Sequence, residues 1–164
     1  SIGGTPVDST VADLCLTVTS DIVDVTPPEL VSASISPTSV DVTNGPQEVV
    51  LTVEATDDFS GLRGMRFDFQ AADPDLCCWP SMLFSQALES PAQFELVSGS
   101  STSGTWQSRD TVAAGTPPET ACVVGLMFTD RLGNENSQGP FSIGGTPVDS
   151  TVADLCLTVV NTGG

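Results

Sequence analysis

The chain has 164 residues, of which 21 are Asp or Glu and only 4 are Lys or Arg, and its net charge is −17. This charge argues against a nucleic-acid partner, because phosphate binding requires clustered Lys and Arg. The sequence contains no run of 18 apolar residues, so membrane insertion is not expected. A strongly acidic surface does attract divalent cations, and the carboxylates are therefore the first candidates for a functional site.

A sequence repeat sets the organisation of the chain. Residues 1–18 read SIGGTPVDSTVADLCLTV, and residues 142–159 read the same, at an offset of 141. A window cut from a tandem array with this period accounts for the identity. We therefore expect four parts: the final strand of a preceding repeat at 1–18, a linker at 19–26, one complete β-sandwich repeat at 27–160, and the start of the next linker at 161–164.

Alternation of apolar and polar residues predicts β-strands along the whole repeat. In 47–56 the residues Val49, Leu51 and Val53 share one face, and in 121–129 the same pattern puts Cys122 on the face of Phe128. We expect seven strands, at 30–36, 47–56, 62–70, 93–98, 104–112, 121–129 and 153–160. Their number and spacing predict an all-β fold, an Ig-like antiparallel β-sandwich of about seven strands that serves as a tandem repeat unit.

Three turn motifs support this interpretation and carry a family resemblance. They are DVTPP at 24–28, ATDDFSG at 55–61 and DRLGN at 130–134. In this order they resemble the bacterial Ig-like tandem repeats of large secreted and surface proteins, with a DxTPP entry and acidic turns after the second and sixth strands. The resemblance covers about residues 24–134 and implies a stalk, adhesin or matrix fibre, not an enzyme. A Cys-rich insertion at 71–91 and a long connection at 134–152 depart from the pattern.

The same topology predicts a cation site. The entry of the domain and the loops after the second and sixth strands lie at one end of such a sandwich. Carboxylates gathered there repel each other unless a cation lies among them, and Ca²⁺ accepts six to eight oxygen ligands. Hydrogen bonds that merely hold the turns are the alternative. The predicted ligands of Ca²⁺ are Asp24, Asp57, Asp58, Asp130 and Asn134.

The cysteines indicate disulfides and an extracellular or cell-surface location, since each repeat contains four of them. They are expected toward the opposite end of the sandwich. Cys122 is predicted to face the core and Cys156 to face outward, so a direct bond between them is not expected. Each is expected to pair with one of the adjacent Cys77 and Cys78, and Cys15 takes the place of Cys156 in the preceding repeat. Free thiols are the alternative, while zinc is disfavoured because His and CxxC motifs are absent.

The favoured function is a structural repeat of an extracellular fibre, stalk or surface-layer protein, assembled head to tail with neighbouring copies through calcium-stiffened joints. Leu14, Leu16 and Val18 would bury one face of the strand at 1–18 within the preceding unit. An adhesin or carbohydrate-binding module is one alternative, with a glycan or another surface ligand stacked on Trp79 or Trp106, although core roles for both are favoured. Donor-strand exchange through 1–18 in a filament subunit is another. Catalysis is not expected, because the chain has no His and no catalytic motif.

Overall fold

The computed structural model describes residues 23–71, 80–81, 94–138, 152 and 154–163. Every strand expected from the sequence is present, with ends that differ by a few residues, and three short strands are added. None of the described residues forms a helix with the length and hydropathy of a transmembrane span. The strands are β1 (Glu29–Ser36), β2 (Ser39–Asp41), β3 (Gln47–Thr56), β4 (Leu62–Ala71), β5 (Pro80–Ser81), β6 (Glu95–Gly99), β7 (Ser103–Val112), β8 (Glu119–Asp130), β9 (Glu135–Gln138) and β10 (Cys156–Val160).

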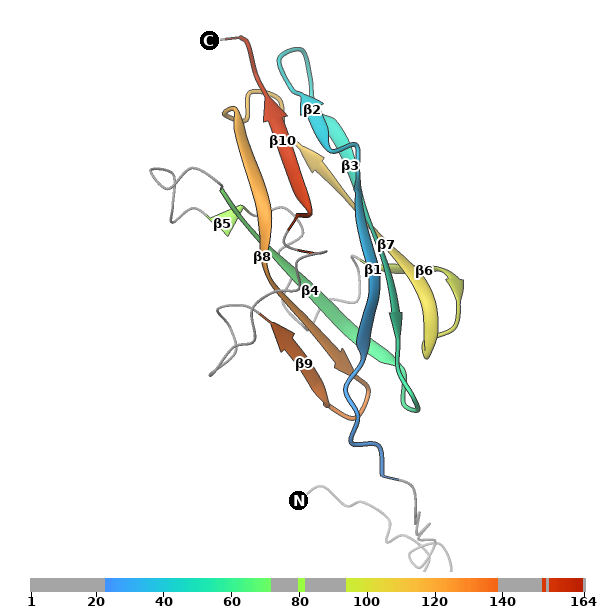
Figure 1. Ribbon diagram of the computed structural model, residues 1–164. Coiled ribbons are helices and arrows are strands. Elements are labelled where there is room, and N and C mark those ends of the chain that lie inside the picture. Colours follow the sequence, from blue (N-terminus) through green and yellow to red (C-terminus); the bar gives the residue numbers. More distant parts are fainter. Residues whose placement is uncertain (1–22, 72–79, 82–93, 139–151, 153, 164) are drawn as a thin grey trace, which may run out of the picture.

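The strands form two sheets that pack as a sandwich (Figure 1). One sheet has the order β1-β3-β7-β6, and the other has the order β2-β10-β8-β4-β5 with β9 also paired to β8. The described pairs are antiparallel except for β2 and β10, which run parallel. This arrangement of strands between the two sheets is that of the immunoglobulin sandwich, and it confirms the predicted fold class.

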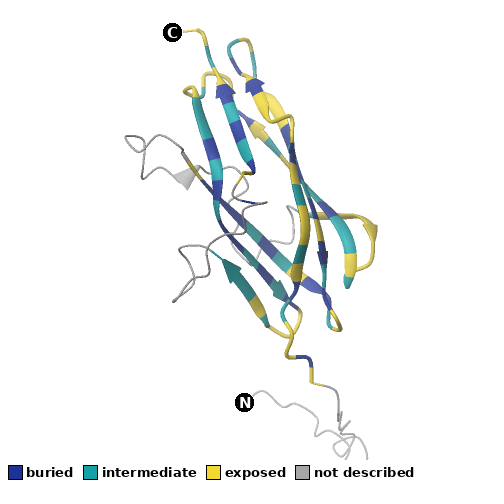
Figure 2. Cartoon of the chain, in the orientation of Figure 1, coloured by how far each residue is buried: buried dark blue, intermediate teal, exposed yellow. Residues whose placement is uncertain are grey.

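The core lies between the two sheets, and buried residues alternate with more exposed ones along the central strands (Figure 2). Val49, Leu51 and Val53 of β3 are fully buried, as the alternation predicts. The ring of Phe67 meets that of Phe128 edge-on, with centroids 5.9 Å apart. Trp106 is 7% exposed and belongs to this core, so it offers no face for stacking a sugar, whereas Trp79 lies outside the described residues.

One edge of strand β8 is divided between two partner strands. Both β9 and β10 pair with β8 on the edge opposite β4, β9 beside residues 126–129 and β10 beside residues 119–122. The connection expected at 134–152 therefore contains a strand. Leu155, Leu157 and Val159 are buried, which confirms that the second copy of the repeated segment closes the sandwich beside β8. Leu14, Leu16 and Val18 of the first copy lie outside the described residues.

The structure corrects the predicted disulfide pairing. Cys122 and Cys156 are bonded to each other as opposite residues of β8 and β10, with Cα atoms 4.1 Å apart. The two residues are directly opposite each other in adjacent strands, so their sulfur atoms can bond directly, without Cys77 or Cys78 as partners. The expected partners Cys77 and Cys78, and the repeated Cys15, lie outside the described residues.

An irregularity in β8 explains why the prediction was wrong. The register with β4 shifts between Asp68 and Phe69, and β8 contains one extra residue there. On the Cys122 side of this bulge, Ala121 and Val123 are the buried residues. The prediction assumed that every second residue from Phe128 to Cys122 faces the core. The extra residue shifts this alternation by one, so the Cys122 side chain points away from the core and toward Cys156.

We expect the double substitution Cys122→Ala and Cys156→Ala to lower the free energy of unfolding by roughly 2–4 kcal/mol, because the bond restricts the unfolded chain. Urea unfolding of the oxidised protein measures this difference. Peptide mapping without reductant, using a protease that cleaves at acidic residues, should recover Cys122 joined to Cys156. Recovery of both joined to the peptide that contains Cys77 and Cys78 would contradict this pairing.

Candidate metal centre

Asp24 ties together three segments at the end of the sandwich where the chain enters. Its carboxylate accepts hydrogen bonds from the N–H of Thr26 at 3.1 Å and from the N–H of Ser60, in the β3–β4 loop, at 2.9 Å. Its backbone carbonyl accepts a bond of 3.1 Å from the amide of Asn134, in the β8–β9 turn. The side chain is only 8% exposed. The Asp of the DxTPP entry therefore fixes both acidic turns relative to the entering chain.

Asp57 shapes the β3–β4 loop and also leaves one oxygen without a partner. Its Oδ1 accepts the N–H groups of Phe59 and Gly61. Gly61 has a φ of +84°, and a Cβ there would lie 2.6 Å from the hydroxyl of Ser101, so glycine is required. Asp57 is 8% exposed, yet its Oδ2 has no hydrogen-bond partner. A buried carboxylate oxygen in this state is costly, and a bound cation would satisfy it.

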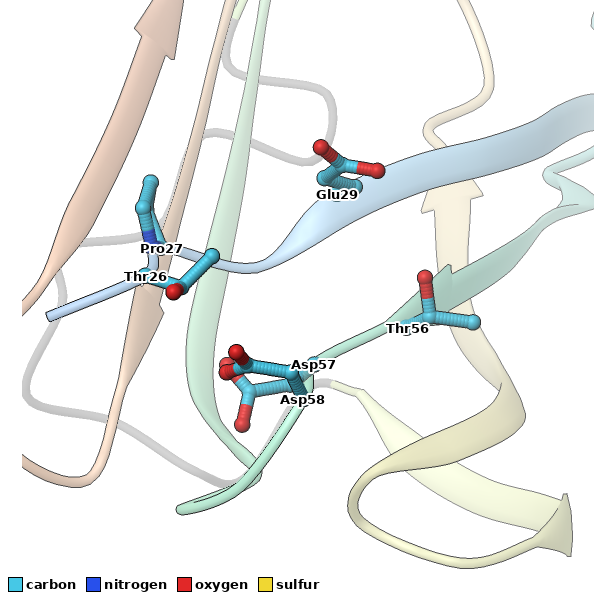
Figure 3. Close-up of a pocket in the computed structure, with 6 residues that line it drawn as sticks. All are labelled: Thr26, Pro27, Glu29, Thr56, Asp57 and Asp58. Carbon is cyan, nitrogen blue, oxygen red and sulfur yellow. The ribbon is translucent and has the colours of Figure 1, made fainter. Parts of the chain in front are cut away.

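Three carboxylates meet at this point. Asp24, Asp57 and Asp58 each place an oxygen within 4.8 Å of the others, with the first two buried and Asp58 exposed. Figure 3 shows the carboxylates of Asp57 and Asp58 side by side, facing Thr26 of the entry segment. They border an open hollow lined by Thr26, Pro27, Glu29, Thr56, Asp57 and Asp58.

The electrostatics of this triad, Asp24, Asp57 and Asp58, favour a cation. Carboxylates at such separations repel one another. The ion pairs of the described residues are Arg66–Asp68 and Arg109–Glu48, and neither includes the triad. Oxygen-only donors suit hard divalent ions, Ca²⁺ and Mg²⁺. The arrangement can therefore hold such an ion between the entry segment and the β3–β4 loop.

Asp130 and Asn134 make hydrogen bonds within the β8–β9 turn, and their role as metal ligands stays a prediction. Oδ1 of Asp130 accepts the N–H groups of Leu132 and Asn134, both at 2.8 Å, and Oδ2 accepts the Asn134 amide at 2.6 Å. Asp130 is fully buried. Asp130 is not in the group of three carboxylates, and Asn134 contacts that group through the carbonyl of Asp24. Their hydrogen bonds hold the β8–β9 turn, which is the alternative to metal binding that the sequence analysis considered. Asn134 also joins that turn to Asp24.

These hydrogen bonds set the pKa of Asp130. Burial alone would raise the pKa of this carboxyl, but the hydrogen bonds from the side chain and backbone of Asn134 and from the Leu132 N–H outweigh it. The pKa of Asp130 therefore lies below its ordinary value.

Glu29 lines the hollow beside Asp57 and Asp58, and the sequence analysis missed it. It opens β1 directly after Pro27 and Pro28, where a polar residue is typical of a strand exposed on one face. Its position at the start of the strand, next to the acidic turn, was the available signal.

Comparison with known proteins adds no relative. No family model matches the chain, and no curated protein or solved structure is significantly similar to it. Function is therefore inferred from the repeat, the fold and the acidic site.

Replacement of Asp130 by Ala should lower the free energy of unfolding by roughly 2–4 kcal/mol, because the donors of Leu132 and Asn134 lose a charged acceptor. Chemical denaturation at neutral pH measures the effect. Glu95→Ala is the matched control, since Glu95 is an exposed carboxylate on β6, and it should change stability by less than about 0.5 kcal/mol. Equal stability of the two variants would contradict the bracing role.

The same residue predicts an acid dependence. A carboxyl whose pKa is lower in the folded state stabilises the fold fully above its unfolded pKa, near 3.8 for Asp130, and this contribution is lost as pH falls through the lower, folded value. Wild type should therefore lose more stability than Asp130→Ala when the pH drops from about 5 to about 3. Urea unfolding at the two pH values provides the comparison, and an equal loss in both proteins would show that Asp130 does not contribute.

Proposed function

We propose that this chain is a structural repeat of an extracellular fibre, stalk or surface-layer protein, joined head to tail to neighbouring copies. The observation that carries the proposal is the identity of residues 1–18 with 142–159, the segment that includes β10. The two ends of the described chain, blue at its start and red at its finish, lie at opposite ends of the long axis of the sandwich (Figure 1). A unit built in this way adds length with each copy.

The disulfide and the acidic surface support the extracellular part of the proposal. The bond between Cys122 and Cys156 is of a kind that persists in oxidising compartments. A net charge of −17 suits a surface that must stay soluble in an environment rich in divalent cations.

Within this function, the triad of Asp24, Asp57 and Asp58 is proposed as a Ca²⁺ site that stiffens the joint between repeats. Asp24 belongs to the chain entering the domain, whereas Asp57 and Asp58 belong to the domain itself. An ion shared between them would hold the entry segment at a fixed angle. The unpartnered Oδ2 of Asp57 and the mixture of buried and exposed oxygen donors support Ca²⁺, which tolerates irregular coordination better than Mg²⁺ does.

Calcium should raise the melting temperature of the protein, and chelation with EDTA should lower it. Asp58→Asn removes one negative charge without removing a hydrogen bond that holds the loop, because Asp58 is exposed and accepts no hydrogen bond from the described residues. In EDTA this variant should melt at or above the wild-type temperature, since one repulsive charge is removed, and it should lose most of the increase that calcium produces. Calorimetry with and without calcium measures both effects.

Glu95→Gln is the control for this experiment, since it removes one exposed carboxylate on β6, away from the triad. It should keep the full response to calcium. A wild-type melting temperature that is the same in calcium and in EDTA would rule out the site.

Strand exchange is the second candidate function, and the same repeat supports it. Residues 1–18 repeat Cys156–Val159, which include every β10 residue paired with β8 and two of the three paired with β2, so they can take the place of β10 in another subunit. The mass of the native polypeptide under denaturing, reducing conditions distinguishes the two arrangements. A covalent array gives many times the mass of one repeat, whereas strand-exchanged subunits give a single-repeat mass.

A further inference from the structure

Exposed apolar residues lie on the segments that meet at the acidic site. Among the described residues, eight large hydrophobic side chains are exposed, and four of them lie on the three segments that meet at Asp24. We call these four the apolar rim: Val23 at 75% exposure, Val25 at 73%, Phe59 at 52% and Leu132 at 63%. Exposed apolar groups gathered on loop tips typically mark a contact surface.

The hydrogen bonds of the site hold the rim together. Val23 and Val25 flank the buried Asp24, which accepts the N–H of Ser60 next to Phe59. The turn that carries Leu132 is joined to the carbonyl of Asp24 through Asn134. The backbone N–H groups of Phe59 and Leu132 are themselves fixed by Asp57 and Asp130. The rim is thus part of a braced surface, as a docking face requires.

The opposite end of the sandwich offers apolar surface of its own. Two loops without a charged residue meet there, VTNGP at 42–46 and AAGTPP at 113–118. The Gly115 N–H donates to the carbonyl of Val42, and the chain leaves beside both loops because Val42 donates its N–H to Val160. We call these two loops the exit face. The Ala and Pro residues at 113–114 and 117–118 are exposed on it, although the carboxylates of Asp41 and Glu119 border it.

We infer that the apolar rim is the docking face for the exit face of the preceding repeat. The inference rests on the proposed tandem arrangement and names the contact within it. By sequence identity, Val18 has the place in the preceding repeat that Val159 has here, at the point where the chain leaves the sandwich beside the exit face. The identity ends there, and residues 19–22 (TSDI) follow Val18 where residues 160–163 (VNTG) follow Val159. Val18 and Val23 are five residues apart, which spans at most about 18 Å. The exit face of the preceding repeat is therefore tethered close to the rim, and contact between them covers apolar surface that otherwise stays in water.

A two-repeat protein tests this contact. Residues 19–164 are placed directly after Val159, and the joint then has its native sequence because 142–159 repeats 1–18. Small-angle X-ray scattering in calcium should be fitted by extended conformers whose maximum dimensions fall in one narrow range. Phe59→Ser with Leu132→Ser in the second repeat should broaden that distribution, while the same pair of changes in the 164-residue chain leaves its melting temperature within about 2 °C of wild type, since both side chains are exposed.

The matched control is Val31→Ser with Leu96→Ser in the second repeat, because these apolar side chains are 60% and 41% exposed but lie outside the rim. This pair should leave the scattering unchanged. A wild-type two-repeat protein that already hinges freely would overturn the inference, and so would a rim variant as ordered as wild type. Rim-dependent binding to phosphatidylserine vesicles in calcium by a freely hinged protein would overturn it in favour of a lipid occupant.

The two proposals fail in different ways. If Asp58→Asn and EDTA leave the scattering unchanged while the rim variant broadens it, the docking contact is supported and the calcium joint is rejected. If the native polypeptide has the mass of one repeat, the tandem arrangement itself is rejected, whatever the two-repeat protein shows.

Discussion

Strand β8 is the element on which the rest of the structure depends, because it is hydrogen-bonded along both edges. It pairs with β4 on one side and with β10 and then β9 on the other. It also supplies Phe128 to the centre of the core. One end of the strand carries the disulfide through Cys122, and the other ends in Asp130, which holds the next turn. The two ends of the domain are therefore connected through one continuous strand.

The acidic end of the domain shows how similar sequence motifs are given different roles. Asp57 and Asp130 each follow a strand and accept N–H groups from the turn that comes next. Asp130 also receives the amide of Asn134, which uses its second oxygen, whereas the second oxygen of Asp57 has no such partner. The difference between a structural aspartate and a candidate ligand is thus the presence of one amide donor.

Residue patterns predict those parts of the fold in which one face of a strand is buried. The alternation in 47–56 predicted both ends of β3 correctly, because Val49, Leu51 and Val53 must all reach the core. The sequence ENSQ of β9 has no apolar residue to alternate, and this strand forms because the free edge of β8 is beside it. The bulge that reverses Cys122 is likewise set by pairing with β4, and Gly125 within the strand was its only signal. Fold topology predicted correctly that Asp24, Asp57 and Asp58 come together. The hydrogen bonds that occupy both oxygens of Asp130 depend on atomic positions that the sequence does not give.

The parallel pairing of β2 with β10 has a mechanical consequence for a unit that is held at its two ends. Tension along the long axis pulls β2 and β10 past each other, so the hydrogen bonds between them are loaded together in shear and do not open one at a time. If tension separates β10 from β8 starting at the C-terminal end of β10, the disulfide stops this separation at Cys156, the first residue of the strand. Force passes directly between the two cysteines, and the chain enclosed between them stays slack. In force spectroscopy, that enclosed chain should add nothing to the extension of an unfolded unit until the bond is reduced.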